Sequence, residues 1–219
     1  MPGSTVSGNW VSRLRHFVSP PAALEHCQFC QAPIAAKHPH LIELSNRGVV
    51  CASPDCADIE TARRGSPYRL IPQNLLLLRD FAISDAQWAA FQIPIDLVFV
   101  FLDSAARRPV ALYPGAAGAI QSALGLEAWS ELAAGNPVLN QLAPDVEALL
   151  VNRTKESREY YRAPIDRCFA LAGLIRTHWR GLSGGNAVWD NIERYFARLR
   201  SEAAGADSSA GADRAAGDG

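Results

Sequence analysis

The stretch "IPIDLVFVFLDSAARRPVALYP" at residues 93–114 predicts the centre of the fold. Residues 93–103 have the β-branched and aromatic composition of a buried strand. Residues 104–109 have the composition of a turn, and residues 110–114 resume an apolar extended run. Because two apolar strands joined by a short polar turn pair antiparallel, we expect this stretch to form the middle of an antiparallel sheet.

The segments on either side of this hairpin are predicted to be mostly helical. Ser84 with Gln87 three residues later is a capping-box pattern, which predicts that a helix starts there. Residues 115–123, "GAAGAIQSA", and residues 126–135, "LEAWSELAAG", are also expected to be helical. Residues 144–153, "PDVEALLVNR", fit either a helical turn leading into a strand or a single strand, and periodicity does not decide between them.

Two amphipathic helices are predicted in the C-terminal part. Pro164 lies just inside the start of the first, over residues 163–179, as is common for proline in a first helical turn. The second covers residues 186–200. Each has one apolar stripe. The stripe residues are Ile165, Phe169, Ala172, Ile175 and Trp179 in the first helix and Val188, Ile192, Tyr195, Phe196 and Leu199 in the second.

Residues 27–56 contain four of the five cysteines of the chain. They form a C-x-x-C pair and a C-x-x-x-x-C pair, Cys27 with Cys30 and Cys51 with Cys56. Between the pairs, "HLIEL" alternates apolar and polar residues, "SNRG" has the composition of a turn and "VVC" resumes an extended run, which together predict a β-hairpin. Pro54 is expected to open a short helix that extends to about residue 62.

Two cysteine pairs joined by a hairpin are typical of a zinc ribbon, in which four thiolates hold one tetrahedral ion. We therefore predict zinc bound by Cys27, Cys30, Cys51 and Cys56. Such a site has no open coordination position, so its role would be structural. The same thiolates could instead hold iron, act as a redox pair or bind no metal. A histidine could also replace one cysteine as a ligand. The candidates are His26, His38 and His40.

Other polar or reactive residues are best explained as structural. Cys168 lies beside the apolar stripe of a predicted helix, where a lone cysteine is usually a small core residue. Asp145, Glu147 and Arg153 share one face if their segment is extended, because their separations are even. They could line a pocket, but ordinary ion pairs on a strand face are the simpler interpretation.

Composition excludes several functional classes. The formal net charge of −1 does not favour nucleic-acid binding. No signal peptide and no apolar run long enough to span a membrane is present, and the odd cysteine count favours thiols or metal over disulfides. We expect a cytoplasmic protein, and the oligomeric state is left open.

Several segments together are similar to an uncharacterised bacterial family. They are "CQFCQAPIAAKHPHLIEL", "IPIDLVFVF", "YPGAAGAIQS", "PDVEALLVNR" and the run from Pro164 to Phe196. Members of that family resemble proteins encoded near nickel–iron hydrogenase structural and maturation genes. The resemblance implies a link to that system over about residues 25–200, but it implies no reaction and no site residue.

These observations predict an α+β protein with a zinc-ribbon-like N-terminal element and an antiparallel sheet packed with C-terminal helices. The expected parts are an N-terminal helix and linker (1–24), the zinc-ribbon-like element (25–62), an α+β domain (63–200) and a disordered tail (201–219). The expected function is that of a non-enzymatic accessory protein that assists the assembly, maturation or partner docking of a nickel–iron hydrogenase. Its partner would be a hydrogenase subunit or a maturation protein. The alternative is an enzyme or an electron-transfer protein that uses iron or thiols.

Overall fold

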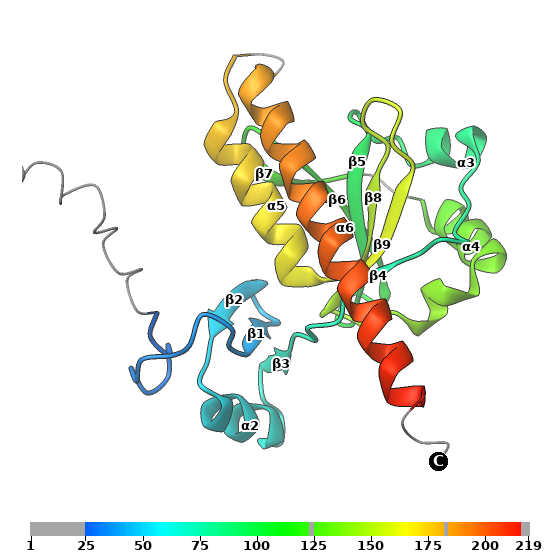
Figure 1. Ribbon diagram of the computed structural model, residues 1–219. Helices are drawn as coiled ribbons and strands as arrows, with labels where there is room; N and C mark the ends of the chain where they lie inside the picture. The colour runs from blue at the N-terminus through cyan, green and yellow to red at the C-terminus, as the bar shows by residue number, and fades with distance from the viewer. Residues whose placement is uncertain (1–24, 123–124, 182–183, 216–219) are drawn as a thin grey trace, which may run out of the picture.

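The computed structural model describes residues 25–122, 125–181 and 184–215, with side chains up to residue 204 (Figure 1). Two antiparallel sheets and the helices packed against them make up this part of the chain. The α+β class with an antiparallel sheet is thus confirmed. The helix predicted within residues 1–24 lies outside the described residues.

The larger sheet is built around the hairpin expected at its centre. Strands β5 (Leu97–Asp103) and β6 (Arg108–Gly115) pair antiparallel with Phe99 opposite Leu112. On its other side β5 pairs with β8 (Glu147–Asn152), so residues 147–152 of the undecided segment form a strand. The full order is β4-β9-β8-β5-β6-β7, in which β4 is Leu76–Leu77, β9 is Glu159–Pro164 and β7 is Gly118–Gln121.

Strand β7 corrects the prediction of a helix over residues 115–123. Residues 118–121 pair with β6, and Gly115 lies opposite Gly118 across a tight turn. Gly118 has a φ of 106°, which side chains other than glycine's rarely adopt. The unpaired edge of β6 offers backbone hydrogen bonds to this segment, and these outweigh the weak helical preference of a glycine-rich sequence.

Helices cover both faces of the larger sheet (Figure 1). Helices α5 (Ile165–His178) and α6 (Asn186–Ala215) pack on one face. Helix α3 (Asp85–Ala90), helix α4 (Leu126–Gly135) and the 3-10 turn η1 (Pro137–Gln141) cover the other. Alternate residues of β5 point to the two layers, as strand geometry requires. Phe99 and Phe101 lie in the α5/α6 core, whereas Val98 and Val100 lie in the core beneath α4.

A second, three-stranded sheet lies near the N-terminus in a unit that we call the N-terminal module, residues 25–70. It contains β1 (His40–Glu43), β2 (Gly48–Cys51), α2 (Pro54–Ala62) and β3 (Tyr68–Leu70), in the strand order β2-β1-β3. The hairpin predicted over residues 40–51 and the helix that begins at Pro54 are both confirmed. Strand β3 extends this unit beyond residue 62, where the sequence placed its end.

The small sheet has two differently buried faces. Leu41 faces a core that belongs to the N-terminal module alone, together with Cys27, Ile34, Ala52 and Ala57. Its neighbour Ile42 faces the opposite way and joins the α5/α6 core of the larger domain, with Val49 packed beside it. One face therefore holds the module together, and the other attaches it to the rest of the molecule.

Helix α6 continues to Ala215, into the segment for which the composition predicted a disordered tail. Ala203 is 2% exposed and belongs to the α5/α6 core. Alanine has the highest helical propensity, so an alanine-rich segment prolongs a helix that is already anchored by packing. The low apolar content of this segment was therefore a poor guide to its backbone conformation.

Candidate metal centres

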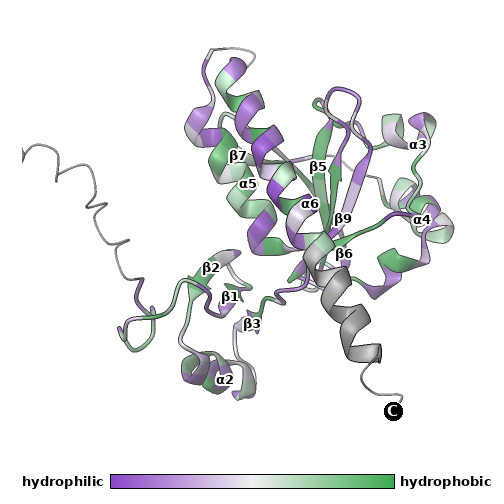
Figure 2. Cartoon of the chain, viewed as in Figure 1, coloured by the Kyte–Doolittle hydropathy of each residue, from purple (hydrophilic) through white to green (hydrophobic). Residues whose placement is uncertain are grey.

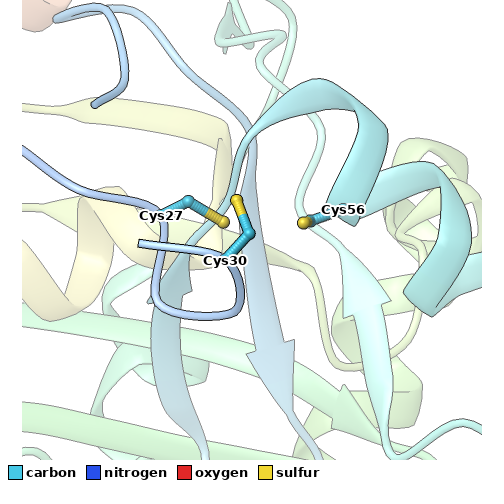
Figure 3. A group of neighbouring side chains, drawn as sticks. All are labelled: Cys27, Cys30 and Cys56. Carbon is cyan, nitrogen blue, oxygen red and sulfur yellow. The ribbon is translucent and has the colours of Figure 1, made fainter. Parts of the chain in front are cut away.

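The first candidate centre starts at the C-x-x-C turn. The turn is closed by hydrogen bonds from the Gln31 N–H to the Cys27 carbonyl and from the Cys27 N–H to the Ala32 carbonyl, both 2.9 Å long. Gln31 has a φ of 62°, which completes the reversal of the chain. This geometry places the side chains of Cys27 and Cys30 on the same side of the turn (Figure 3).

Helix α2 supplies a third thiol. Ser53 is its N-cap, and the Cys56 N–H donates to the Ser53 hydroxyl over 3.4 Å. The cap places Cys56 in the first helical turn, where its thiol points toward the other two (Figure 3). The sulfur atoms of Cys27, Cys30 and Cys56 all lie within 4.8 Å of one another. We call these three residues the thiol cluster.

Ser53 is also a polar neighbour of the thiol cluster. Its hydroxyl lies 3.9 Å from the Cys30 sulfur. Burial disfavours the Cys27 thiolate, but hydrogen bonds from the backbone of Cys30, Ser53 and Phe29 and from the Ser53 hydroxyl outweigh it and lower the pKa of Cys27 to about 6. Negative charge is therefore stabilised at this place, as a cation site requires.

The Cys56 thiol ionises less easily than the Cys27 thiol. The Ser53 hydroxyl favours the thiolate of Cys56, yet hydrogen bonding with the Cys30 thiol, burial and the Cys27 thiolate together raise the pKa of Cys56. Adjacent thiolates repel one another, and a divalent ion removes that repulsion. The chemistry of the thiol cluster thus suits a metal ion that favours sulfur, such as zinc or iron.

Cys51 lies in a second group instead. Its sulfur, one ring nitrogen of His38 and one ring nitrogen of His40 all lie within 4.8 Å of one another. In the antiparallel register Cys51 is directly opposite His40, so the two side chains project from the same face of the small sheet. We call Cys51, His38 and His40 the histidine–cysteine cluster.

Both histidines of this cluster are oriented by oxygen atoms. The Nδ1 atom of His40 lies 2.6 Å from Oδ2 of Asp166, at the start of α5. The Nδ1 atom of His38 lies 2.8 Å from the carbonyl of Ala35, and the Glu25 carboxylate is 3.4 Å away. The two Nε2 atoms face one another at 3.0 Å. Burial and the negative charges of Glu25 and Cys27 raise the pKa of the Cys51 thiol.

The histidine–cysteine cluster borders a pocket of about 800 Å³ between the N-terminal module and helices α5 and α6. The same pocket is also lined by Asp166 and Arg167 from α5 and by Glu202 from α6. Arg167 and Glu202 form an ion pair of 3.3 Å. The cluster is therefore reachable from solvent through a space large enough for a small ligand.

The four predicted ligands are thus divided between two groups. The structure brings Cys27, Cys30 and Cys56 together and places Cys51 with two histidines. Sequence reasoning considered His38 and His40 only as replacements for a cysteine. The H-x-H spacing was the available signal, because residues two apart in an extended chain share a face. Asp166 is 126 positions from His40 and gave no signal.

Asp145, Glu147 and Arg153 do not form one pocket. Glu147 holds Arg162 through two hydrogen bonds of 2.8 and 2.7 Å. The Asp145 carboxylate accepts a hydrogen bond from the Ser104 N–H and pairs with Arg69 at 3.5 Å. Arg153, beyond the other end of β8, pairs with Asp85 and lies over the Trp88 ring. All three residues are buried and serve in structural ion pairs.

Cys168 is fully buried in the α5/α6 core. Burial and the nearby Asp166 carboxylate raise its pKa. A thiol in this environment is a weak nucleophile, which agrees with its interpretation as a core residue.

No helix in residues 25–122, 125–181 or 184–215 has the length and apolar character needed to cross a bilayer. Neither a search of curated proteins nor a search of solved structures returned a match. Residues 26–203, which include both clusters and both sheets, match a family of unknown function, DUF5947, and the chain belongs to that family.

Proposed function

We propose that this chain is a zinc-binding, non-enzymatic accessory protein in which the thiol cluster holds the N-terminal module in shape. The observation that carries the proposal is the convergence of three thiols from two separate segments, the C-x-x-C turn and helix α2. Zinc is preferred because tetrahedral thiolate-rich sites favour it and because such an ion stabilises small folds outright.

The size of the module's own core supports a structural role for the ion. Its buried residues are Cys27, Ile34, Leu41, Ala52 and Ala57. Most of these are small side chains, and units below about 40–50 residues rarely bury enough apolar surface to fold without a metal, a disulfide or a partner. A metal bound by the thiol cluster would connect the C-x-x-C turn directly to α2.

Metal analysis of the purified protein tests this proposal. The wild-type chain should contain zinc, and Cys30→Ser should lower the content by about one ion per chain. Cys30 is suitable because its side chain is exposed, so the substitution leaves the core intact. Lys155→Ala is a control, since Lys155 pairs with Glu193 on the larger domain. Stoichiometric iron with visible colour would contradict the proposal and favour electron transfer.

We propose further that the partner is a nickel–iron hydrogenase subunit or a maturation protein of that system. This part rests on the resemblance of the sequence segments. The N-terminal module offers a contact surface, because Ile59 on α2 and Leu70 on the outer strand β3 are 65% and 49% exposed. Large apolar side chains on a surface are frequent in protein interfaces.

A pull-down with separately expressed hydrogenase subunits and maturation proteins tests the partner. Wild type and Lys155→Ala should retain one of them, whereas Ile59→Asp and Leu70→Asp should lose it while keeping their zinc. Retention of none by the wild type would refute the partnership and leave the zinc proposal standing. Equal retention by the two aspartate variants would exclude this surface.

A further inference from the structure

We propose that His38, His40 and Cys51 form a second metal site, separate from the thiol cluster, which binds a divalent transition ion such as Zn²⁺ and keeps one coordination position open to the pocket. This inference goes beyond the proposed function, because it concerns other ligands and a different kind of site. It rests on ring orientation, strand register and the supporting residues.

The hydrogen-bond partners of the two imidazole rings determine which ring nitrogen carries the proton. A backbone carbonyl only accepts hydrogen bonds, so the Nδ1 atom of His38 must donate to Ala35. The Asp166 carboxylate likewise accepts from Nδ1 of His40. A neutral imidazole with its proton on Nδ1 has a bare lone pair on Nε2. Two such lone pairs face one another at 3.0 Å, which is a favourable arrangement only with a cation or an added proton between them.

The Cys51 sulfur is the third donor atom of the proposed site. Tetrahedral zinc with nitrogen bonds of about 2.0 Å and sulfur bonds of about 2.3 Å holds its donor atoms roughly 3.3–3.6 Å apart. The Cys51 sulfur already lies within 4.8 Å of one ring nitrogen of each histidine. The Nε2 pair would separate by only a few tenths of an ångström, and the sulfur would approach by a rotation about its side-chain bonds. Imidazole and thiolate together suit zinc better than magnesium or calcium.

Two groups that do not themselves bind the ion orient the histidine rings. Metal-binding histidines usually donate their other ring nitrogen to a carboxylate or a carbonyl, which fixes the tautomer and the ring orientation. Asp166 and the Ala35 carbonyl supply both of these supports. Asp166 is itself held by the Arg167 N–H, 2.8 Å from its second oxygen. The cluster is thus supported from α5, outside the N-terminal module.

The face of the small sheet on which the ligands lie distinguishes this site from the thiol cluster. Residues two apart in a strand share a face, so His40 and Cys51 lie on the face of the small sheet that carries Ile42 and Val49. That face packs against the larger domain. The three ligands leave one tetrahedral position, and they line the pocket of about 800 Å³. Three protein ligands with an accessible fourth position are typical of sites that bind an exogenous ligand.

Cobalt and zinc titrations of the full chain test this inference. The wild type should bind about two zinc ions, and His40→Ala and Cys51→Ser should each remove about one, while Cys30→Ser removes the other. His178→Ala is the matched control, because His178 bonds to the Leu174 carbonyl within α5. Unchanged zinc content in His40→Ala and Cys51→Ser would overturn the second site, whatever the result for Cys30→Ser.

Two further measurements address the support and the open position. Asp166→Asn retains all three ligands, so it should bind cobalt with roughly 10–100-fold lower affinity and the wild-type stoichiometry. Unaltered affinity would remove Asp166 from the site. In the Cys30→Ser background, azide should change the visible spectrum of bound cobalt by taking the open position. A spectrum insensitive to azide would mean that a protein group, such as the nearby Glu25, closes the site.

Discussion

Ser53 has two roles that meet at one hydroxyl group. It caps helix α2 by accepting the Cys56 N–H, and it lies 3.9 Å from the Cys30 sulfur. Serine offers an oxygen, which is a weaker zinc ligand than a thiolate. A cysteine at position 53 would therefore place a fourth sulfur beside the thiol cluster.

Ser53→Cys should increase zinc affinity by at least roughly tenfold, because a fourth thiolate closes the coordination shell. The metal-free variant should unfold more easily by about 1 kcal/mol, since cysteine caps a helix less well than serine. Chelator competition measures the first effect and chemical denaturation the second. Ser53→Ala is the matched control, which loses the cap and gains no ligand. Equal zinc affinity for wild type and Ser53→Cys would place the ion elsewhere.

Zinc affinity should rise with pH between about 6 and 9. Metal binding requires thiolates, and the interactions at Cys56 raise its pKa, so a proton must leave that thiol when zinc binds. Cys27, with a pKa of about 6, is half protonated at the lower end of this range and ionised above it, so affinity should fall further below pH 6. Chelator competition at several pH values measures the slope. A flat profile would contradict thiolate ligation.

At the scale of secondary-structure elements, some conformations could be predicted from the local sequence alone. The central hairpin, the capping box at Ser84 and the apolar stripe of α6 were predictable, because each depends on residues close in sequence. The stripe predicted for α5 was only partly right, since Cys168 and Leu171 are buried there while Phe169 and Trp179 are only partly buried. Strand β7 was not, since its conformation depends on pairing with β6. The turn between them requires a backbone angle at Gly118 that a composition-based prediction of a helix ignores.

Gly118→Val should destabilise the protein by about 1–3 kcal/mol, because a β-branched residue is strained at a φ of 106°. The loss should appear in chemical denaturation as a lower midpoint with an unchanged slope. Gly135→Ala at the end of α4 is the control, since no atom lies within 4 Å of the added methyl group. Equal stability of Gly118→Val and wild type would contradict the β6–β7 turn.

The candidate site was only partly predictable for a similar reason. The cysteine spacing identified the segment and the kind of ligand, and the thiol cluster retains three of the four expected residues. Strand parity assigns Cys51 and His40 to the other face, where His40 contacts Asp166, a residue distant in sequence. Asp166 becomes a neighbour of His40 only when the N-terminal module packs on α5, which no local pattern encodes.

At the scale of the whole molecule, polar contacts and ion pairs join the N-terminal module to the larger domain. His40 meets Asp166, Arg47 meets Asp103, and Arg69 lies 3.5 Å from Asp145. Ile42 adds an apolar contact with the α5/α6 core. The module is therefore attached along one face of its sheet rather than by its linker alone.

Adjacent substitutions in β1 should separate folding of the module from its attachment. Ile42→Ala and Leu41→Ala each remove a fully buried side chain, at a cost of about 2–5 kcal/mol. Ile42→Ala should increase hydrogen exchange at the contact with α5, whereas Leu41→Ala should weaken the module's own core and lower zinc affinity at the thiol cluster. Identical exchange patterns for the two variants would contradict the two-faced packing.

Gln28 links the two clusters directly. It lies within the C-x-x-C turn, and its backbone N–H and side-chain carbonyl bond to the backbone of Cys51 over 2.9 and 2.7 Å. With both proposed ions in place, each would order a residue on which the other depends, and such coupling is reciprocal. Each ion would then raise the affinity of the other site by the same factor, so a variant that loses one ion should bind the remaining ion more weakly than the wild type does.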